Sequence, residues 1–133
     1  MFEVSVEEVF PAGHALRNYH GKCENVHGHN YRVRVTVQGP DVDENGLLID
    51  FAEVKRLVRA VKDRLDHQFL NDLPPFDSIN PSAENIAKYF YDEINGRLST
   101  GMLHVVRLHE VKLWETDVAC ATYRPHAAIP SSN

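Results

Sequence analysis

The sequence predicts an α+β fold in which antiparallel strands precede and follow two helices. Apolar and polar residues alternate over residues 2–7 and 31–38, and apolar residues recur every three or four positions over 51–65. Strand-like composition returns over 103–115 and again over 118–123, with a turn at Thr116 and Asp117. The chain has 133 residues, about one domain, and is long enough to bury a core without disulfides. We therefore expect a single domain over residues 1–124 and a loose tail over 125–133.

The first two strands follow from period-two alternation. The first is predicted to run from near the N-terminus toward Pro11, and the second contains the alternating residues Tyr31, Val33, Val35 and Val37. Residues 12–29 between them have no period, so they are expected to form a long loop. Long loops inside compact domains are often functional.

Two helices follow the predicted hairpin. Residues 47–49 (LLI) suggest a short strand leading to Asp50, which with Glu53 resembles a capping box at a helix start. The first helix should bury the apolar positions Phe51, Val54, Leu57, Val58, Val61 and Leu65. The second helix begins after Pro74 and Pro75, with Asn80 or Ser82 as its N-cap. Its expected buried stripe is Ile86, Ala87, Phe90 and Ile94.

Composition narrows the class of protein. Hydrophobic residues make up 43% and charged residues 25% of the chain, as in soluble globular proteins. A net charge of −5 argues against a broad nucleic-acid surface, and no apolar run reaches the roughly 20 residues that span a bilayer. The first residues lack the pattern of a secretion signal, so a cytoplasmic location is expected. Of the two cysteines, Cys120 lies in the apolar VACATY and is expected in the core.

Three histidines are candidate metal ligands. His27 and His29 are two apart in an extended segment, so they point to the same side. His14 ends the first strand, and a hairpin-like return would place it beside them. Three histidines with no acidic fourth ligand nearby would leave one position open, as catalytic zinc requires.

Cys23 precedes these histidines and has three interpretations: a fourth metal ligand, a reactive nucleophile or base, or buried filler. Its polar loop and the neighbouring Lys22 argue against filler, because inert buried thiols prefer apolar surroundings. A site closed by Cys23 would be structural. Composition does not distinguish a ligand from a base.

Two carboxylates are further candidates. Asp66 and His67 lie at the end of the first helix, where His67 either complements the helix dipole or is oriented by Asp66 for proton transfer. Glu115 shares strand parity with Val111 and Leu113, which places it on the apolar side. A guanidine-like or pterin-like N–H edge would give its two oxygens two hydrogen bonds.

These motifs together resemble a known family. His14, CENVHGH (23–29), DFAEVK (50–55), LDHQFLND (65–72), NPSAEN (80–85) and WET (114–116) are similar to the 6-pyruvoyltetrahydropterin synthase superfamily. The similarity is greatest to its 6-carboxytetrahydropterin synthase branch, of queuosine biosynthesis, and covers residues 2–124. It implies the T-fold, a four-stranded antiparallel sheet with two helices on one face, and a homohexamer, a dimer of trimers, with active sites at subunit interfaces.

The resemblance also implies a role for each site residue. His14, His27 and His29 would bind catalytic Zn²⁺, and Cys23 would be a catalytic base rather than a ligand. Asp66 and His67 match the relay pair, and Glu115 matches the glutamate that anchors the pterin. Ser82 falls where the family often has a threonine that contacts substrate. Arg17, Lys22 and Arg124 are candidate cations for a triphosphate.

The implied reaction converts 7,8-dihydroneopterin triphosphate to 6-carboxytetrahydropterin and releases acetaldehyde and triphosphate. Glu24 departs from the commonest loop of this branch and gives the mixed pattern C-E-x-x-H-G-H. That pattern implies a second activity forming 6-hydroxymethyl-7,8-dihydropterin for folate, with Glu24 as its residue. The alternatives are a pyruvoyl-forming phosphate lyase and a non-catalytic pterin-binding module with structural zinc.

Overall fold

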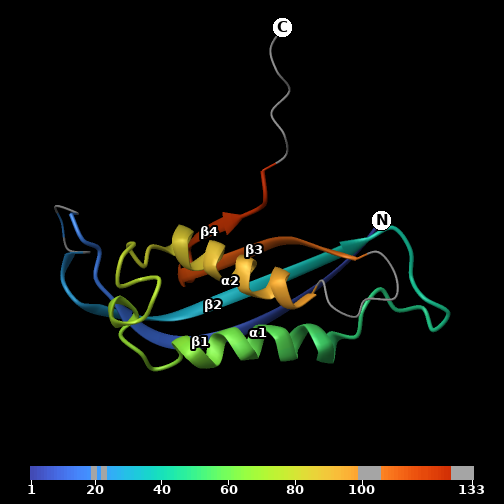
Figure 1. Cartoon of the computed structure of the whole chain (residues 1–133), viewed down its shortest axis with the longest axis horizontal. Coiled ribbons are helices and arrows are strands. Elements are labelled where there is room, and N and C mark those ends of the chain that lie inside the picture. The colour runs from blue at the N-terminus through green and yellow to red at the C-terminus, as the bar shows by residue number, and fades with distance from the viewer. Residues whose placement is uncertain (19–20, 22–23, 99–105, 127–133) are drawn as a thin grey trace, which may run out of the picture.

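A computed structural model describes residues 1–18, 21, 24–98 and 106–126. In these residues four strands form one antiparallel sheet in the order β1-β2-β3-β4, and two helices cover one of its faces (Figure 1). The strands are β1 (Phe2–His14), β2 (His27–Gly39), β3 (Arg107–Thr116) and β4 (Ala119–Tyr123). The helices are α1 (Phe51–Leu65) and α2 (Ala83–Leu98), with a short 3₁₀ turn, η2 (Leu70–Asp72), between them. The predicted ββααββ order is confirmed.

The first two strands are longer than predicted. β1 runs beyond Pro11 to His14, and β2 begins at His27 rather than at Tyr31. Part of the expected long loop therefore belongs to the sheet, and the connection shortens to residues 15–26. The alternation disappears at these strand ends because glycines and histidines replace the apolar residues, while the backbone pairing continues from Phe2↔Gly39 to His14↔His27.

The helices form for the reasons that the sequence suggested. The Asp50 carboxylate accepts a hydrogen bond from the Ala52 N–H at 2.8 Å and so caps α1. The Ser82 hydroxyl accepts from the Asn85 N–H at 3.2 Å, which makes Ser82 rather than Asn80 the side chain that caps α2. Both predicted apolar stripes are buried except at Phe51, which is exposed.

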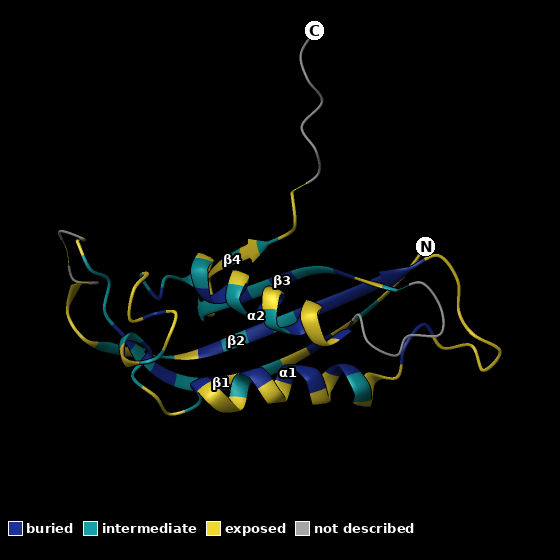
Figure 2. Ribbon diagram, in the orientation of Figure 1, coloured by how far each residue is buried: buried dark blue, intermediate teal, exposed yellow. Residues whose placement is uncertain are grey.

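The core lies between the sheet and the helices. α1 packs on β1, and α2 packs on β3 and β4. Figure 2 shows the buried positions along β2 and on the sides of the helices that face the sheet. Phe10 of β1 stacks on Tyr31 of β2 with ring centroids 5.3 Å apart, and Phe90 of α2 closes over Phe10 at 5.7 Å. This aromatic cluster fixes the sheet directly beside the histidine-bearing strand ends.

Two further expectations are wrong. Residues 47–49 form no strand; Leu48 and Ile49 are buried from an irregular segment, so their apolar character reflects packing rather than pairing. Cys120 is exposed rather than in the core, because it sits opposite Trp114 on the sheet face that the helices do not cover. Within the described part of the chain, every helix is too short or too polar to cross a bilayer.

Candidate metal centre and active site

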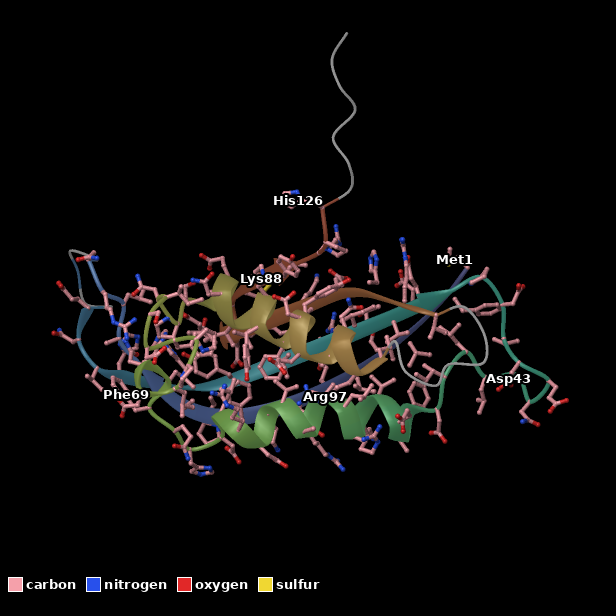
Figure 3. All side chains as sticks on the ribbon, viewed as in Figure 1. Met1, Asp43, Phe69, Lys88, Arg97 and His126 are labelled. Carbon is pink, nitrogen blue, oxygen red and sulfur yellow. The ribbon has the colours of Figure 1, made fainter. Side chains whose placement is uncertain are left out.

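The three candidate histidines converge at one end of the sheet. His14 is the last residue of β1 and pairs directly with His27, the first residue of β2, and His29 lies two residues further on the same side. Their ligand atoms all lie within 4.8 Å of one another. This end of the molecule is the one where Phe69 is labelled in Figure 3, opposite the turn that contains Asp43.

Backbone carbonyls orient two of the rings. The Nδ1 of His14 lies 2.7 Å from the Pro81 carbonyl oxygen, and the Nδ1 of His27 lies 2.6 Å from that of Asn25. A carbonyl only accepts, so each Nδ1 carries the hydrogen and each Nε2 of a neutral ring presents a lone pair. These two Nε2 atoms are 2.9 Å apart, and the buried Nε2 of His29 has no hydrogen-bond partner among the described residues. Two lone pairs at that distance need a proton or a cation between them, so the donor set fits a metal ion.

Burial also favours the neutral form of two of these imidazoles. His14 is 1% exposed, and this burial lowers its pKa, an effect only partly offset by the Pro81 carbonyl and the Glu115 carboxylate. Burial also lowers the pKa of His29. Both rings therefore stay neutral at lower pH than an ordinary histidine does. The neutral ring is the form that binds metal.

Glu115 lies beside the same cluster. Its two carboxylate oxygens are each 3.9 Å from an Nε2, one from that of His14 and the other from that of His29. The β3–β4 pairing shifts register between Trp114 and Thr116, as a β-bulge does, and bulges commonly re-aim a side chain next to a site. The structure thus brings an acidic side chain close to two of the three histidines, which the ligand count along the sequence did not anticipate.

Two asparagines hold the segment after His14 through contacts that the sequence analysis did not predict. Asn71 exchanges two hydrogen bonds with the backbone of Ala15, at 3.0 and 2.8 Å. Asn80 does the same with the backbone of Arg17, at 2.8 and 2.9 Å. The Arg17 guanidinium donates to the carbonyls of Ile79, Asn71 and Phe76, which gives this candidate phosphate ligand a structural role. The motifs LDHQFLND and NPSAEN thus carry the asparagines that position His14.

A small pocket adjoins Glu115. Its volume is about 220 Å³, and it is lined by Leu16, Ser82, Ala83, Glu84, Glu115, Ala119 and Cys120. Ser82 and Glu115, the two predicted substrate-binding residues, therefore line one pocket. The Ser82 oxygen accepts the α2 cap hydrogen bond, and its own O–H stays available as a donor.

Asp66 and His67 end α1 at a second pocket. The His67 Nδ1 lies 2.9 Å from the Asp66 carboxylate, and His67 has a left-handed φ of 58° with its side chain 77% exposed. His67 and His29 line the same pocket of about 640 Å³. In the described ranges, no hydrogen bond or ion pair joins Asp66 or His67 to the three histidines, so the structure brings this pair near the cluster without a polar contact.

The remaining predicted residues lie in the connection between β1 and β2. Glu24 is exposed, and its N–H donates to the Gly21 carbonyl at 3.1 Å. Cys23 and Lys22 lie outside the described residues. Arg124 pairs with Glu110 at 3.2 Å, and this glutamate lies opposite Thr36 in the β2–β3 ladder, away from the strand ends that carry the histidines.

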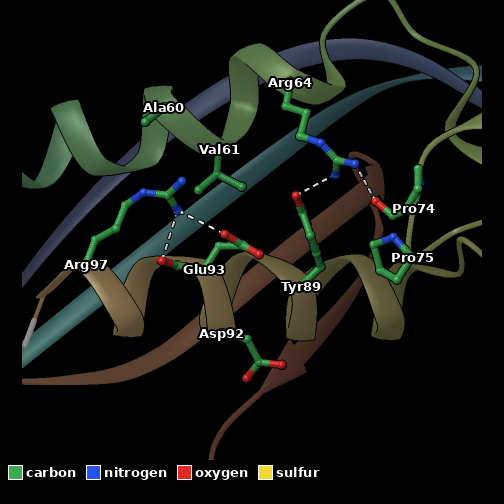
Figure 4. Close-up of a pocket in the computed structure, with 9 residues that line it drawn as sticks. All are labelled: Ala60, Val61, Arg64, Pro74, Pro75, Tyr89, Asp92, Glu93 and Arg97. Atoms are coloured by element: carbon green, nitrogen blue, oxygen red, sulfur yellow. Dashed lines mark hydrogen bonds and ion pairs between the residues drawn. The ribbon is translucent and has the colours of Figure 1, made fainter.

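A further pocket between the helices contains none of the predicted site residues (Figure 4). Its volume is about 540 Å³. Its arginines already have partners: Arg64 donates to the Tyr89 hydroxyl at 2.6 Å, and Arg97 pairs with Glu93 at 3.2 Å. The unusual chemistry of the described chain is concentrated at the histidine cluster instead.

Comparison with known proteins gives a consistent result. A sequence model of the family described as 6-pyruvoyl tetrahydropterin synthase matches residues 3–126. The 6-carboxy-5,6,7,8-tetrahydropterin synthase of Bacillus subtilis is 33% identical over 129 residues, covering 93% of this chain and 86% of its own. That of Aquifex aeolicus is 32% identical over 123 residues, covering 77% and 76%. The human 6-pyruvoyl tetrahydrobiopterin synthase is 36% identical over 108 residues, covering 78% and 71%.

Solved structures confirm the predicted T-fold. The 6-pyruvoyl tetrahydropterin synthase of Caenorhabditis elegans superposes with a TM-score of 0.78 at 30% identity, covering 95% of this chain and 98% of that one. The corresponding synthase of Plasmodium falciparum gives a TM-score of 0.75 at 26% identity, with the same coverage.

Proposed function

The chain belongs to the 6-pyruvoyl tetrahydropterin synthase family, and on that premise we propose that it is a zinc-dependent 6-carboxy-5,6,7,8-tetrahydropterin synthase. The proposed reaction takes 7,8-dihydroneopterin triphosphate and one water to 6-carboxytetrahydropterin, acetaldehyde and triphosphate, in queuosine biosynthesis. The observation that carries the proposal is the convergence of three imidazoles with oriented Nε2 atoms. The names of the bacterial relatives favour the carboxy product over the pyruvoyl one.

His14, His27 and His29 would hold the zinc ion. Three neutral nitrogens suit Zn²⁺, and outer hydrogen bonds from two of the rings are typical of such ligands. When bound, zinc supplies a Lewis acid that stabilises negative charge developing on the side-chain oxygens of the substrate.

The protein's own groups would move the protons. Cys23 would serve as the catalytic base, and His67, paired with Asp66, would exchange the second proton. His67 is exposed, and no hydrogen bond or ion pair among the described residues joins it to the histidine cluster of its own chain, which supports a site completed by a second copy. We therefore include in the proposal a homohexamer, a dimer of trimers, with active sites at subunit interfaces.

Glu115 and Ser82 would bind the pterin. The Glu115 carboxylate accepts two hydrogen bonds from the guanidine-like edge of the ring, and the Ser82 hydroxyl donates a third. Their pocket of about 220 Å³ is smaller than the roughly 300–1,000 Å³ of typical ligand sites, as expected if a neighbouring subunit supplies a wall. The proposed partners are thus this small molecule and further copies of the chain, in the cytoplasm, without nucleic acid or membrane.

A second activity is favoured by one observation. Glu24 directly follows Cys23 in C-E-x-x-H-G-H and is exposed in the segment leading to His27. We propose that Glu24 takes part in forming 6-hydroxymethyl-7,8-dihydropterin from the same substrate. The carboxylate would replace the thiol as the proton acceptor in this branch of the reaction.

The test is product identification by mass spectrometry, with zinc-loaded full chain and 7,8-dihydroneopterin triphosphate. Wild type should release acetaldehyde and 6-carboxytetrahydropterin. Cys23→Ala should lose this product while still binding zinc. Glu24→Ala should selectively lose the 6-hydroxymethyl product, whereas Glu44→Ala, another exposed glutamate, should retain it.

Each rival predicts a different result. A pyruvoyl product would support the phosphate-lyase alternative. Unchanged substrate would support a pterin-binding module that does not catalyse the reaction. A zinc–sulfur distance of about 2.3 Å in the X-ray absorption spectrum of active, substrate-free protein would overturn the base role of Cys23. If Glu24→Ala changes neither product, the second activity is wrong.

A further inference from the structure

Glu115 lies between two sites. Its oxygens are each 3.9 Å from a different Nε2 of the histidine cluster, and the same side chain lines the pocket that contains Ser82. It is 27% exposed, so it is neither packed in place nor fully solvated. The two oxygens of this carboxylate can therefore bind either an ion held by the histidines or a ligand in the pocket.

The distances to the histidines are close to those of a fourth ligand. With metal–ligand bonds of about 2.0–2.2 Å, neighbouring donors around a tetrahedral ion are roughly 3.3–3.6 Å apart. The measured 3.9 Å separations exceed that range by a few tenths of an ångström. Glu115 is not one of the three residues whose ligand atoms all lie within 4.8 Å of one another, so binding an ion held by the imidazoles would require its side chain to rotate toward them.

The pocket makes a competing demand. A guanidine-like edge that donates two hydrogen bonds occupies both carboxylate oxygens, as a bidentate pair does. Glu115 is therefore unable to bind the ion and the ring edge fully at the same time. Whichever ligand it contacts is stabilised at the expense of the other.

We propose that Glu115 is an exchangeable metal ligand: it completes the coordination of the ion while the pocket is empty and leaves when a pterin ring enters. This inference rests on the proposed function. Its departure opens a coordination position at the moment when the substrate side chain arrives, and it protects the ion before that. By linkage, a pterin ring that does not itself touch the metal must weaken metal binding, and the metal must weaken binding of that ring by the same factor.

The test uses 6-methylpterin, whose side chain carries no oxygen to bind the metal. Zinc affinity is measured by chelator competition with and without saturating 6-methylpterin, for wild type, Glu115→Gln and Glu84→Gln. In wild type, 6-methylpterin should weaken zinc binding about tenfold, within the usual range of such couplings. Glu115→Gln should bind zinc about tenfold more weakly without pterin and show no further weakening with it. Glu84→Gln, the other carboxylate of the pocket, should bind zinc like wild type.

A second, spectroscopic experiment uses the wild-type protein alone. In the Co²⁺-substituted wild type, 6-methylpterin should change the visible d–d absorption, because an oxygen ligand leaves the ion. Unchanged spectra together with unchanged zinc affinity overturn the inference, while zinc binding and product formation would leave the proposed function intact. Absence of any zinc binding to the wild type would overturn both.

Discussion

His14 and His27 face each other at the end of the β1–β2 ladder with their Nε2 atoms 2.9 Å apart, while each Nδ1 donates to a backbone carbonyl. The two carbonyls, of Pro81 and Asn25, fix the tautomer of each ring and its direction. The pair is thus held in a geometry that is unfavourable for two neutral rings alone and favourable around a cation.

The first prediction concerns metal binding. His27→Ala removes one of three nitrogens and should lower zinc affinity by more than the roughly 10- to 100-fold that loss of an outer hydrogen-bond partner costs. His109→Ala, at a partly exposed imidazole 4.0 Å from Glu3, is the matched control and should retain one zinc per chain. Metal content after dialysis measures the difference. Equal zinc content in the two variants would contradict the three-histidine site.

The second prediction concerns pH and the metal-free protein. Burial lowers the pKa of His14 and His29 below the ordinary 6.5, so the unfolded chain takes up protons that the folded chain resists. The free energy of unfolding should therefore fall as the pH drops below about 6.5, by up to about 1.4 kcal/mol per pH unit for each histidine. Urea unfolding between pH 7.5 and 5 checks this. His14→Gln should have a shallower slope, and an identical slope would contradict the assignment.

The third prediction compares two buried tyrosines. The Tyr31 hydroxyl has no hydrogen-bond partner among the described residues, and burial, then the Glu115 charge, raises its pKa. The Tyr91 hydroxyl donates to the Leu108 carbonyl at 3.1 Å. Tyr91→Phe should lower the free energy of unfolding by about 1 kcal/mol, whereas Tyr31→Phe should leave it unchanged or raise it slightly. A loss of 1 kcal/mol or more from Tyr31→Phe in urea melts would show that its hydroxyl has a partner.

The fourth prediction separates strain from chemistry at His67. Its φ of 58° is in the left-handed region, which costs a side-chain-bearing residue about 1–2 kcal/mol and is usual for glycine after a helix end. His67→Gly should be at least as stable as wild type, and His67→Ala about 1 kcal/mol less stable than His67→Gly. Both should lose product formation. Activity in His67→Gly would mean that His67 only ends the helix.

Much of the fold could be predicted because burial follows side-chain periodicity. The alternation in β2 and the apolar faces of both helices gave the right elements and the right buried sides. The strand ends were missed because Gly13 and Gly28 contribute backbone pairing without an apolar signal. Leu48 was misassigned because a buried irregular segment has the same composition as a short strand.

The parts of the candidate site that consist of side chains on paired strands could be predicted. His14, His27 and His29 follow from strand pairing and parity. The carbonyls of Pro81 and Asn25 were not predictable, because backbone acceptors leave no mark in residue identity. Nor was the distance of Glu115 from two histidines, because it lies where the β3–β4 pairing shifts register between Trp114 and Thr116.

The segment after α1 also limits the free edge of the sheet. The His67 N–H donates to the Pro11 carbonyl at 2.7 Å, and the Gly13 N–H donates to that of Gln68 at 3.0 Å. Pro11 has no N–H, and in the described part of the chain no backbone hydrogen bond is formed at the outer edge of β1 over residues 3–9. Any strand that joins this edge must stop before Pro11. The backbone of His67, the residue proposed to exchange a proton, therefore also limits how far a second sheet can extend along this edge.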